Sequence, residues 1–115
     1  MLKLNNIKFV NMTSHDVNDV MSGTTIKKIK GTKEARATIS TIKVMEANGI
    51  SIVKTIVKDV NLPDPIDNTI FIVSGLCLSA MIESNIVRSD IVSPGQVERD
   101  KTGKIVGCQG FRINA

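Results

Sequence analysis

The segment "TIFIVSGLCLSAMIESN", residues 69–85, constrains the fold most, because it passes from one kind of buried element directly into another. Residues 69–74 are nearly all apolar, which is typical of a strand buried on both faces. The following stretch is apolar almost all round and contains Ile82 as its one β-branched residue, so it predicts a short buried helix at about 75–85, which Asn85 can cap. We therefore expect one central helix beside a buried strand.

The remaining segments carry strand and turn signals. The dipeptide Asn48-Gly49 is the favoured two-residue hairpin turn, because both of its positions require positive φ. The apolar residues of the segment that follows this turn, 50–60, also match one face of a helix, so a helix there remains an alternative to a strand. Gly103 suits the left-handed position of a turn at residues 100–103. The expected strands are 7–12, 17–21, 24–30, 35–46, 50–60 and 69–74, with a final hairpin of 95–99 and 104–113.

Length and composition indicate a single folded domain over residues 1–115. Hydrophobic residues make up 42% of the chain and charged residues 23%, which is typical of a globular protein. We expect an α+β fold with a mostly antiparallel, twisted sheet or partly open barrel. Because the chain lacks an apolar run of 18 residues and a signal-peptide pattern, we expect a cytoplasmic protein that does not enter the membrane.

The ligand-forming residues are few. Cys77 and Cys108 lie among apolar neighbours, where a free thiol behaves as a small buried hydrophobe. With one histidine and no Cys-x-x-Cys pair, the sequence predicts neither a metal site nor a cofactor.

The basic cluster "IKKIKGTK" has two interpretations, a contact for a polyanion or a solvated edge that discourages strand pairing. Its lysines are Lys27, Lys28, Lys30 and Lys33. The chain has three Phe, no Tyr and no Trp, so it lacks the exposed aromatic side chains on which single-stranded bases stack. We therefore expect no general nucleic-acid binding.

Ser74 and Gly75 stand where the buried strand meets the helix. The hydroxyl and the first backbone N–H groups of a helix can hold a phosphate or a carboxylate. The alternative is a plain N-cap, worth about 1 kcal/mol.

A second polar group comprises Asn11, Thr13 and His15, which share one face if residues 11–15 are extended. Such a trio suits recognition of a polar small molecule. In the alternative, these residues form a turn in which Asn11 and Thr13 bond the backbone while His15 stays at the surface.

Arg88 and Asp90, two residues apart, also face one way in an extended chain. They form either an internal ion pair or an arginine that holds an anion and is oriented by the carboxylate.

Several motifs together resemble those of a family of small proteins encoded by phages and prophages. They are "N-x-T-x-H", "LP", "T-I-F-I-V-S", "R-x-D-I-V-x-P-G" and "V-x-R-D-x-x-G-K-I-V-G-C". The segment "HDVNDV" departs from the family, because an acidic residue interrupts a run that is usually more apolar. The matching positions are Asn11, Thr13, His15, Leu62, Pro63, Ser74, Arg88, Asp90, Pro94, Arg99, Asp100, Gly103, Gly107 and Cys108.

The resemblance implies a phage protein in the cytoplasm of a bacterial host, where small binding proteins sequester nucleotide-derived immune signals. We expect a phosphate-bearing nucleotide ligand, with Arg88, Ser74 and Gly75 at the phosphate. Asn11, Thr13 and His15 would meet the base or ribose. Two other hypotheses remain: a nucleotide-cleaving enzyme with His15 as general base, and a protein that inhibits a host enzyme by direct contact.

Assembly follows from the apolar surface. The segments at 35–60 carry more β-branched surface than one short helix can cover, and sheet edges need partners. We expect a homodimer or a higher even-numbered oligomer with residues 35–60 at the interface.

Overall fold

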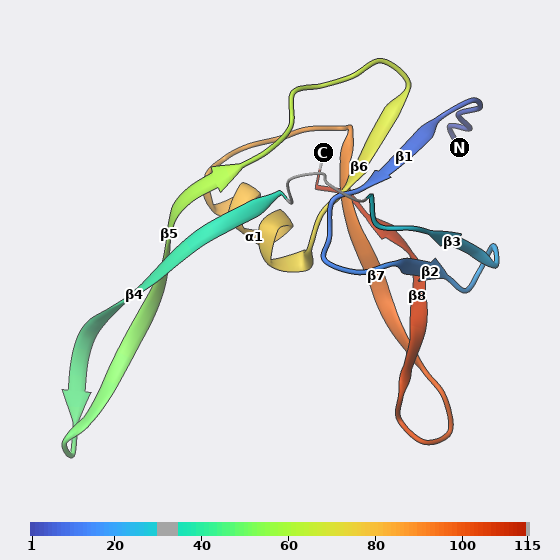
Figure 1. Cartoon of the computed structure of the whole chain (residues 1–115). Coiled ribbons are helices and arrows are strands. Elements are labelled where there is room, and N and C mark those ends of the chain that lie inside the picture. The colour runs from blue at the N-terminus through green and yellow to red at the C-terminus, as the bar shows by residue number, and fades with distance from the viewer. Residues whose placement is uncertain (30–34, 115) are drawn as a thin grey trace.

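The computed structural model describes residues 1–29 and 35–114. Six strands form one sheet in the order β1-β6-β7-β8-β2-β3, and two more strands, β4 and β5, form a separate ribbon (Figure 1). The elements are β1 Lys8–Asn11, β2 Val17–Asp19, β3 Thr24–Ile26, β4 Arg36–Ala47, β5 Ile50–Asn61, β6 Thr69–Ile72, α1 Gly75–Glu83, β7 Ile91–Arg99 and β8 Ile105–Arg112.

The six-stranded sheet curves until its first and last strands approach each other. A parallel bridge joins Asn11, at the end of β1, to Lys28, just beyond β3. The Asn11 side chain strengthens this closure, since its Nδ2 donates to the carbonyl oxygen of Ile26 at 2.9 Å. The sheet is therefore a partly open barrel, and with one short helix among the described residues the structure has the α+β fold that the sequence predicts.

The strand β6 lies between β1 and β7 in this sheet and is buried on both faces, as predicted. Phe71 belongs to an apolar cluster with residues of α1, including Met81, whereas its neighbour Ile72 belongs to a second cluster with Val17 and Val92. Alternate side chains of a strand point to opposite faces, so this one strand supports two cores.

The helix α1 covers one face of the sheet and begins and ends as the sequence indicates. Cys77, Leu78, Ala80 and Met81 are its buried residues. Asn85 has φ of 57° and stands just beyond the last turn, in the left-handed conformation that commonly ends a helix.

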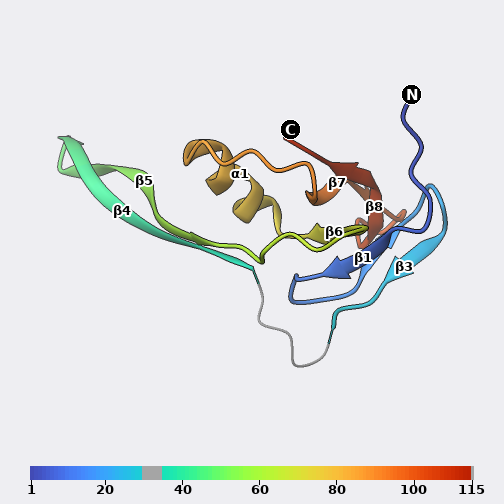
Figure 2. The same cartoon turned by 90° about the horizontal axis from the view of Figure 1, so that it is seen from above.

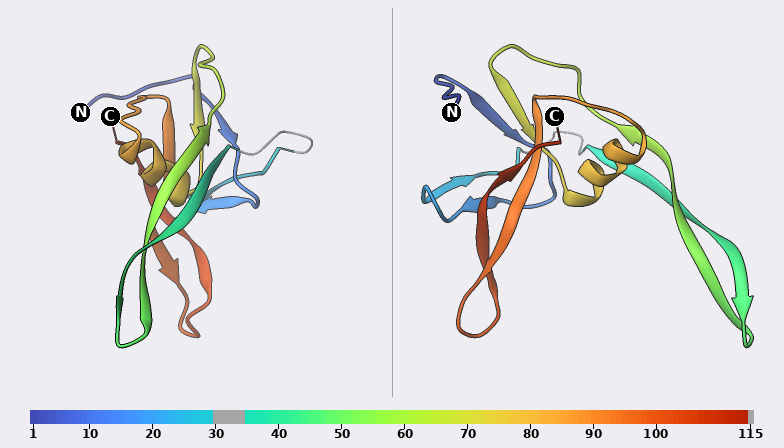
Figure 3. Two further views of the ribbon diagram at one scale, coloured as in Figure 1. Left: turned by 90° about the vertical axis from the view of Figure 1, so that its left-hand side faces the viewer. Right: turned by 180° about the vertical axis from the view of Figure 1, so that it is seen from behind.

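The strands β4 and β5 form a long twisted hairpin that extends away from the barrel (Figures 1 and 3). We call this hairpin, residues 36–61, the arm. Its turn is Asn48-Gly49, with φ of 53° and 77°, as the dipeptide predicts. The helical alternative for the second strand of the arm is wrong, because residues 50–61 pair along their length with β4.

The pairing inside the six-stranded sheet is more mixed than the hairpin signals indicate. Most paired residues are antiparallel, but β1 with β6, β6 with β7, and β2 with β8 are parallel. Strand boundaries also shift: β7 begins at Ile91 rather than at Gly95, because residues 91 and 92 pair with β6 before the final hairpin starts. The strand predicted at 24–30 ends at Ile26, and its last residue, Lys30, lies outside the described residues, as does Lys33.

Among the described residues, no helix has the length and apolar character needed to span a membrane.

Candidate functional site

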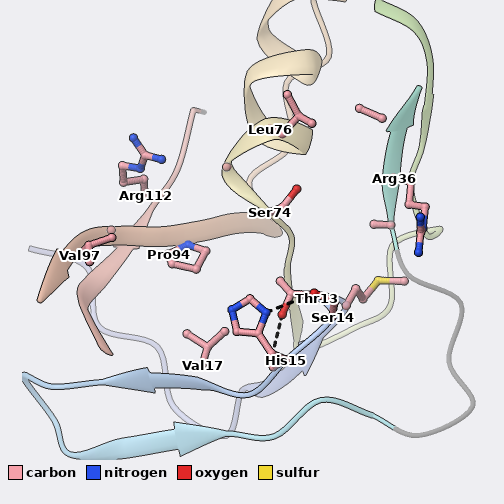
Figure 4. Close-up of a pocket in the computed structure, with 15 residues that line it drawn as sticks. Thr13, Ser14, His15, Val17, Arg36, Ser74, Leu76, Pro94, Val97 and Arg112 are labelled. Carbon is pink, nitrogen blue, oxygen red and sulfur yellow. Dashed lines mark hydrogen bonds between the residues drawn. The ribbon is translucent and has the colours of Figure 1, made fainter. Parts of the chain in front are cut away.

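A pocket of about 500 Å³ opens where the N-terminus of α1 meets the barrel and the base of the arm (Figure 4). Four parts of the chain contribute to it: the turn after β1, the start of β4, the first turn of α1, and strands β7 and β8. Its lining residues are Met12, Thr13, Ser14, His15, Val17, Ala35, Arg36, Ala37, Ser74, Gly75, Leu76, Pro94, Gly95, Val97 and Arg112.

The N-cap residue of α1, Ser74, lies in the wall of this pocket. Ser74 is extended, with φ of −66° and ψ of 158°, and its Oγ accepts a hydrogen bond from the backbone N–H of Cys77 at 3.1 Å. The N-cap interpretation of Ser74 is therefore correct, and the same residue lines the pocket together with Gly75. The positive end of the helix dipole lies there as well, since the first N–H groups of a helix have no partners within it.

Two arginines flank this helix end. Arg112 lies on one side of the first turn of α1 and Arg36 on the opposite side (Figure 4). Arg112 comes so close that a Cβ atom added to Gly75 would be 3.4 Å from the guanidinium nitrogen. Within the described part of the chain, Arg112 has no hydrogen bond or ion pair, and none of the described lining residues is acidic. Arg112 and the N-terminus of α1 therefore place positive charge on the same side of the pocket.

The polar trio after β1 is a turn rather than an extended face. Asn11 is 1% exposed, and its Oδ1 accepts hydrogen bonds from the backbone N–H and the hydroxyl of Thr13 at 3.0 and 2.6 Å. Its Nδ2 donates to the carbonyl oxygens of His15 and Ile26. The Asn11 side chain is thus occupied by the turn and by the end of β3, whereas Thr13 and His15 line the pocket.

His15 is exposed, and its Nδ1 lies 3.2 Å from the hydroxyl oxygen of Ser14, which also lines the pocket. His15 is thus at the surface, as the turn interpretation predicts, and it also lines the pocket.

Arg88 and Asp90 form the internal ion pair that was one of the two interpretations. The guanidinium donates to both carboxylate oxygens, at 2.9 and 2.6 Å, and Nη1 donates to the carbonyl oxygen of Pro63 at 2.7 Å. The hydrogen bond from Arg88 is the main cause that lowers the pKa of Asp90, and it raises the pKa of Arg88 in turn. Neither residue lines the pocket; they tie the loop before β6 to the loop before β7.

A second groove of about 310 Å³ adjoins the pocket along β7 and β8, and His15, Val17, Pro94 and Val97 line both. Its other lining residues are Asp16, Asn18, Ile105, Val106, Gly107 and Cys108. Burial raises the pKa of the Cys108 thiol, and likewise that of Cys77, so neither cysteine is an activated nucleophile.

The arginines at positions 36 and 112 are the functional candidates that the sequence did not single out. Each lies at an end of a strand, and nothing in the local pattern sets it apart from other surface charges. Arg112 follows Phe111 in the apolar run of β8, and that position at the end of the last strand was the one available signal.

Comparison of the chain with protein-family models, with curated proteins and with solved structures found no match. Among residues 1–29 and 35–114, no three His, Cys, Asp or Glu side chains gather as a metal site requires.

Proposed function

We propose that this protein binds a small, phosphate-bearing, nucleotide-derived ligand in the pocket at the N-terminus of α1 and holds it without converting it. The observation that carries this proposal is the approach of Arg112 to that helix end, with no acidic residue among the described lining residues. Two positive features side by side repel each other in an empty pocket, whereas an anion between them satisfies both.

The remaining walls of the pocket suit the organic part of such a ligand. Leu76, Pro94 and Val97 supply apolar surface, and Thr13, Ser14 and His15 supply hydroxyl and imidazole groups on one side. A concave, partly apolar site with a few convergent polar groups is the usual form of a small-molecule site. A sugar or base attached to a phosphate fits this division of polar and apolar walls.

The groups that line the pocket favour retention of the ligand over catalysis. His15 is the only histidine of the chain, and its described side-chain partner is the hydroxyl of Ser14 rather than a carboxylate. A general base of this kind normally needs a third group that orients it. The resemblance to phage proteins supports the same role, namely sequestration of a nucleotide immune signal in a bacterial host.

A hydrolytic enzyme is the second candidate, and the contact between Ser14 Oγ and His15 Nδ1 at 3.2 Å favours it. In that case the hydroxyl or a water molecule would be activated by the imidazole, and the α1 N-terminus would stabilise the developing negative charge.

Calorimetric titration with phosphate-bearing nucleotides tests the proposal. Arg112→Met should weaken binding by about 10-fold or more, because one charge-assisted contact to the phosphate is lost. Arg99→Met is the matched control: Arg99 is an exposed arginine in β7 whose Nη1 bonds the carbonyl oxygen of Gly103, and it does not line the pocket. Equal effects of both substitutions, or no binding of any phosphate-bearing nucleotide to the wild type, would contradict the proposal.

Mass spectrometry of ligand released from the denatured complex separates the two candidates. An unchanged mass supports retention. A cleaved product that forms with the wild type but not with Ser14→Ala or His15→Ala supports the enzyme.

A further inference from the structure

The arm has two faces of different chemistry. Cross-strand partners lie on the same face, and successive pairs alternate between the faces. The pairs Ala47–Ile50, Met45–Ile52 and Ile42–Lys54 therefore share one face, across the register shift near Val44. We call its apolar members, Ile42, Met45, Ala47, Ile50 and Ile52, the tip face.

The opposite face of the same part of the arm is mainly polar. It carries the pairs Glu46–Ser51, Lys43–Val53 and Thr41–Thr55. The ion pair between Lys43 Nζ and Glu46 Oε1, at 2.8 Å, agrees with this assignment, because it requires both side chains on one face. The arm beyond its base is thus an amphipathic ribbon.

The described chain leaves the tip face exposed. Ile50 is 68% exposed, Met45 58%, Ile42 44% and Ile52 41%, and the end of the arm projects away from the barrel (Figure 2). A hairpin of two strands is marginally stable without packing on one face. An apolar face of this kind therefore indicates a partner surface on another molecule.

The groove along β7 and β8 has complementary properties. Val97, Ile105 and Val106 are 46%, 55% and 43% exposed and line it together with Val17 and Pro94. The charges also match, because Asp16 is the acidic residue of the groove lining and Lys54 is the basic residue beside the tip face. The groove is thus concave and apolar, whereas the arm projects.

Area decides between two ways of pairing copies of the chain. The tip face occupies about half of each 12-residue strand of the arm. A two-stranded ribbon of that length measures about 20 Å by about 10 Å, so two tip faces packed against each other bury only about 400 Å². If each tip face instead lies in the groove of the other copy, four such surfaces are covered and about 800 Å² is buried, which is twice the area and lies at the low end for specific interfaces.

We infer that two copies form a reciprocal dimer in which the tip face of each arm lies in the β7–β8 groove of the other. A two-fold axis that brings one arm to one groove brings the second arm to the second groove. The partner's arm then lies beside His15 and Val97, which also line the pocket. The effect on the ligand rests on the proposed function, since the partner's arm would narrow the mouth of the same pocket. The dimer itself does not depend on that function.

Sedimentation of two adjacent substitutions on β5 tests the dimer. Ile52→Glu places a charge on the tip face, whereas Val53→Glu places the same charge on the opposite face of the same strand. Ile52→Glu should raise the dimer dissociation constant by about 100-fold, because the charge is buried twice in a two-fold dimer, and Val53→Glu should leave it within about threefold. Circular dichroism checks that both variants fold. A wild type that stays monomeric at micromolar concentration, or equal effects of the two substitutions, overturns the inference.

A disulfide cross-link tests which surfaces meet. The test uses a Cys108→Ala background, because Cys108 is a native thiol in the groove lining. In that background, Ile52→Cys combined with Val106→Cys should give covalent dimers under mild oxidation, whereas Ile52→Cys alone should give none. Cross-linking of the single variant would show arms packed against each other and would overturn the arrangement.

Ligand titration of the Ile52→Glu variant keeps this inference separate from the proposed function. The dimer predicts binding weakened by about threefold to tenfold, with the phosphate contact at Arg112 intact. If a monomeric variant binds the ligand with unchanged affinity, the partner's arm does not contribute to the site, and the proposed function is unaffected. If the wild type is a dimer but binds no phosphate-bearing nucleotide, the proposed function is wrong, and the dimer is unaffected.

Discussion

The unit β6–α1–β7 and the arm are both rich in isoleucine and valine, yet they place these side chains in opposite environments. Ile72, Val73 and Ile91 are completely buried, whereas Ile50 and Val53 are 68% and 56% exposed. The strand β6 pairs with β1 on one edge and β7 on the other, and other side chains pack on both of its faces. The two strands of the arm pair only with each other, and most of the arm is not covered on either face. The same residue types therefore stabilise the barrel in one region and form a contact surface in the other.

Truncation of one valine in each region should give the largest contrast. Val73→Ala removes two methyl groups from a completely buried site and should lower the free energy of unfolding by about 2–3 kcal/mol. Val53→Ala, on the polar face of the arm, should change it by less than about 0.5 kcal/mol. Urea denaturation of both variants measures the difference. Similar losses would mean that the arm is packed as tightly as the barrel.

The contrast also explains how far the sequence predicts this fold. The turn at Asn48-Gly49, the helix after Ser74 and the left-handed Gly103 are local features, and the structure has all three. The parallel pairing of β1 with β6 joins Lys8 to Thr69 and Asn11 to Ile72, which are far apart in the sequence, and no local pattern encodes which strand becomes the neighbour. The predicted hairpins therefore gave an incomplete account of the sheet.

The candidate site follows the same division. Ser74 was recognisable because a strand-to-helix junction is a local signal, and it lines the pocket. An arginine such as Arg88 can bind an anion, but its guanidinium donates hydrogen bonds to the carboxylate of Asp90, two residues away. Arg112 reaches the helix end only because β8 runs past the N-terminus of α1, which is a tertiary arrangement. Residue type indicated the chemistry of the site, and topology determined which arginine supplies it.

Removal of one cation from each ion pair should give a smaller contrast of the same kind. Arg88→Met leaves Asp90 and the carbonyl oxygen of Pro63 without their partner in a half-buried position, and should cost about 1–2 kcal/mol. Lys43→Met breaks the ion pair with Glu46 on the arm, where both side chains are about half exposed, and should cost less than about 0.5 kcal/mol. Urea denaturation at neutral pH and moderate salt measures both costs. If the substitution on the arm proves the more costly of the two, the ion pair between Arg88 and Asp90 is not what holds the two loops together.

Acid titration of stability should give the smallest and most specific contrast. The hydrogen bonds from Arg88 hold the pKa of Asp90 below its ordinary value of 3.8, so the folded state favours the ionised carboxylate. The resulting stabilisation is fully present above pH 3.8 and is lost as the pH falls through the lower pKa of the folded state. We therefore expect the difference in unfolding free energy between wild type and Asp90→Asn to be constant from pH 7 to about pH 5 and to shrink below about pH 4. The pair Lys43–Glu46 is about half exposed, where water and salt screen it, so the difference between wild type and Glu46→Gln should stay small throughout. Urea denaturation of the three proteins at a series of pH values measures these curves. If the Asp90→Asn difference instead grows as the pH falls, Arg88 does not stabilise the ionised form of Asp90 in the folded protein.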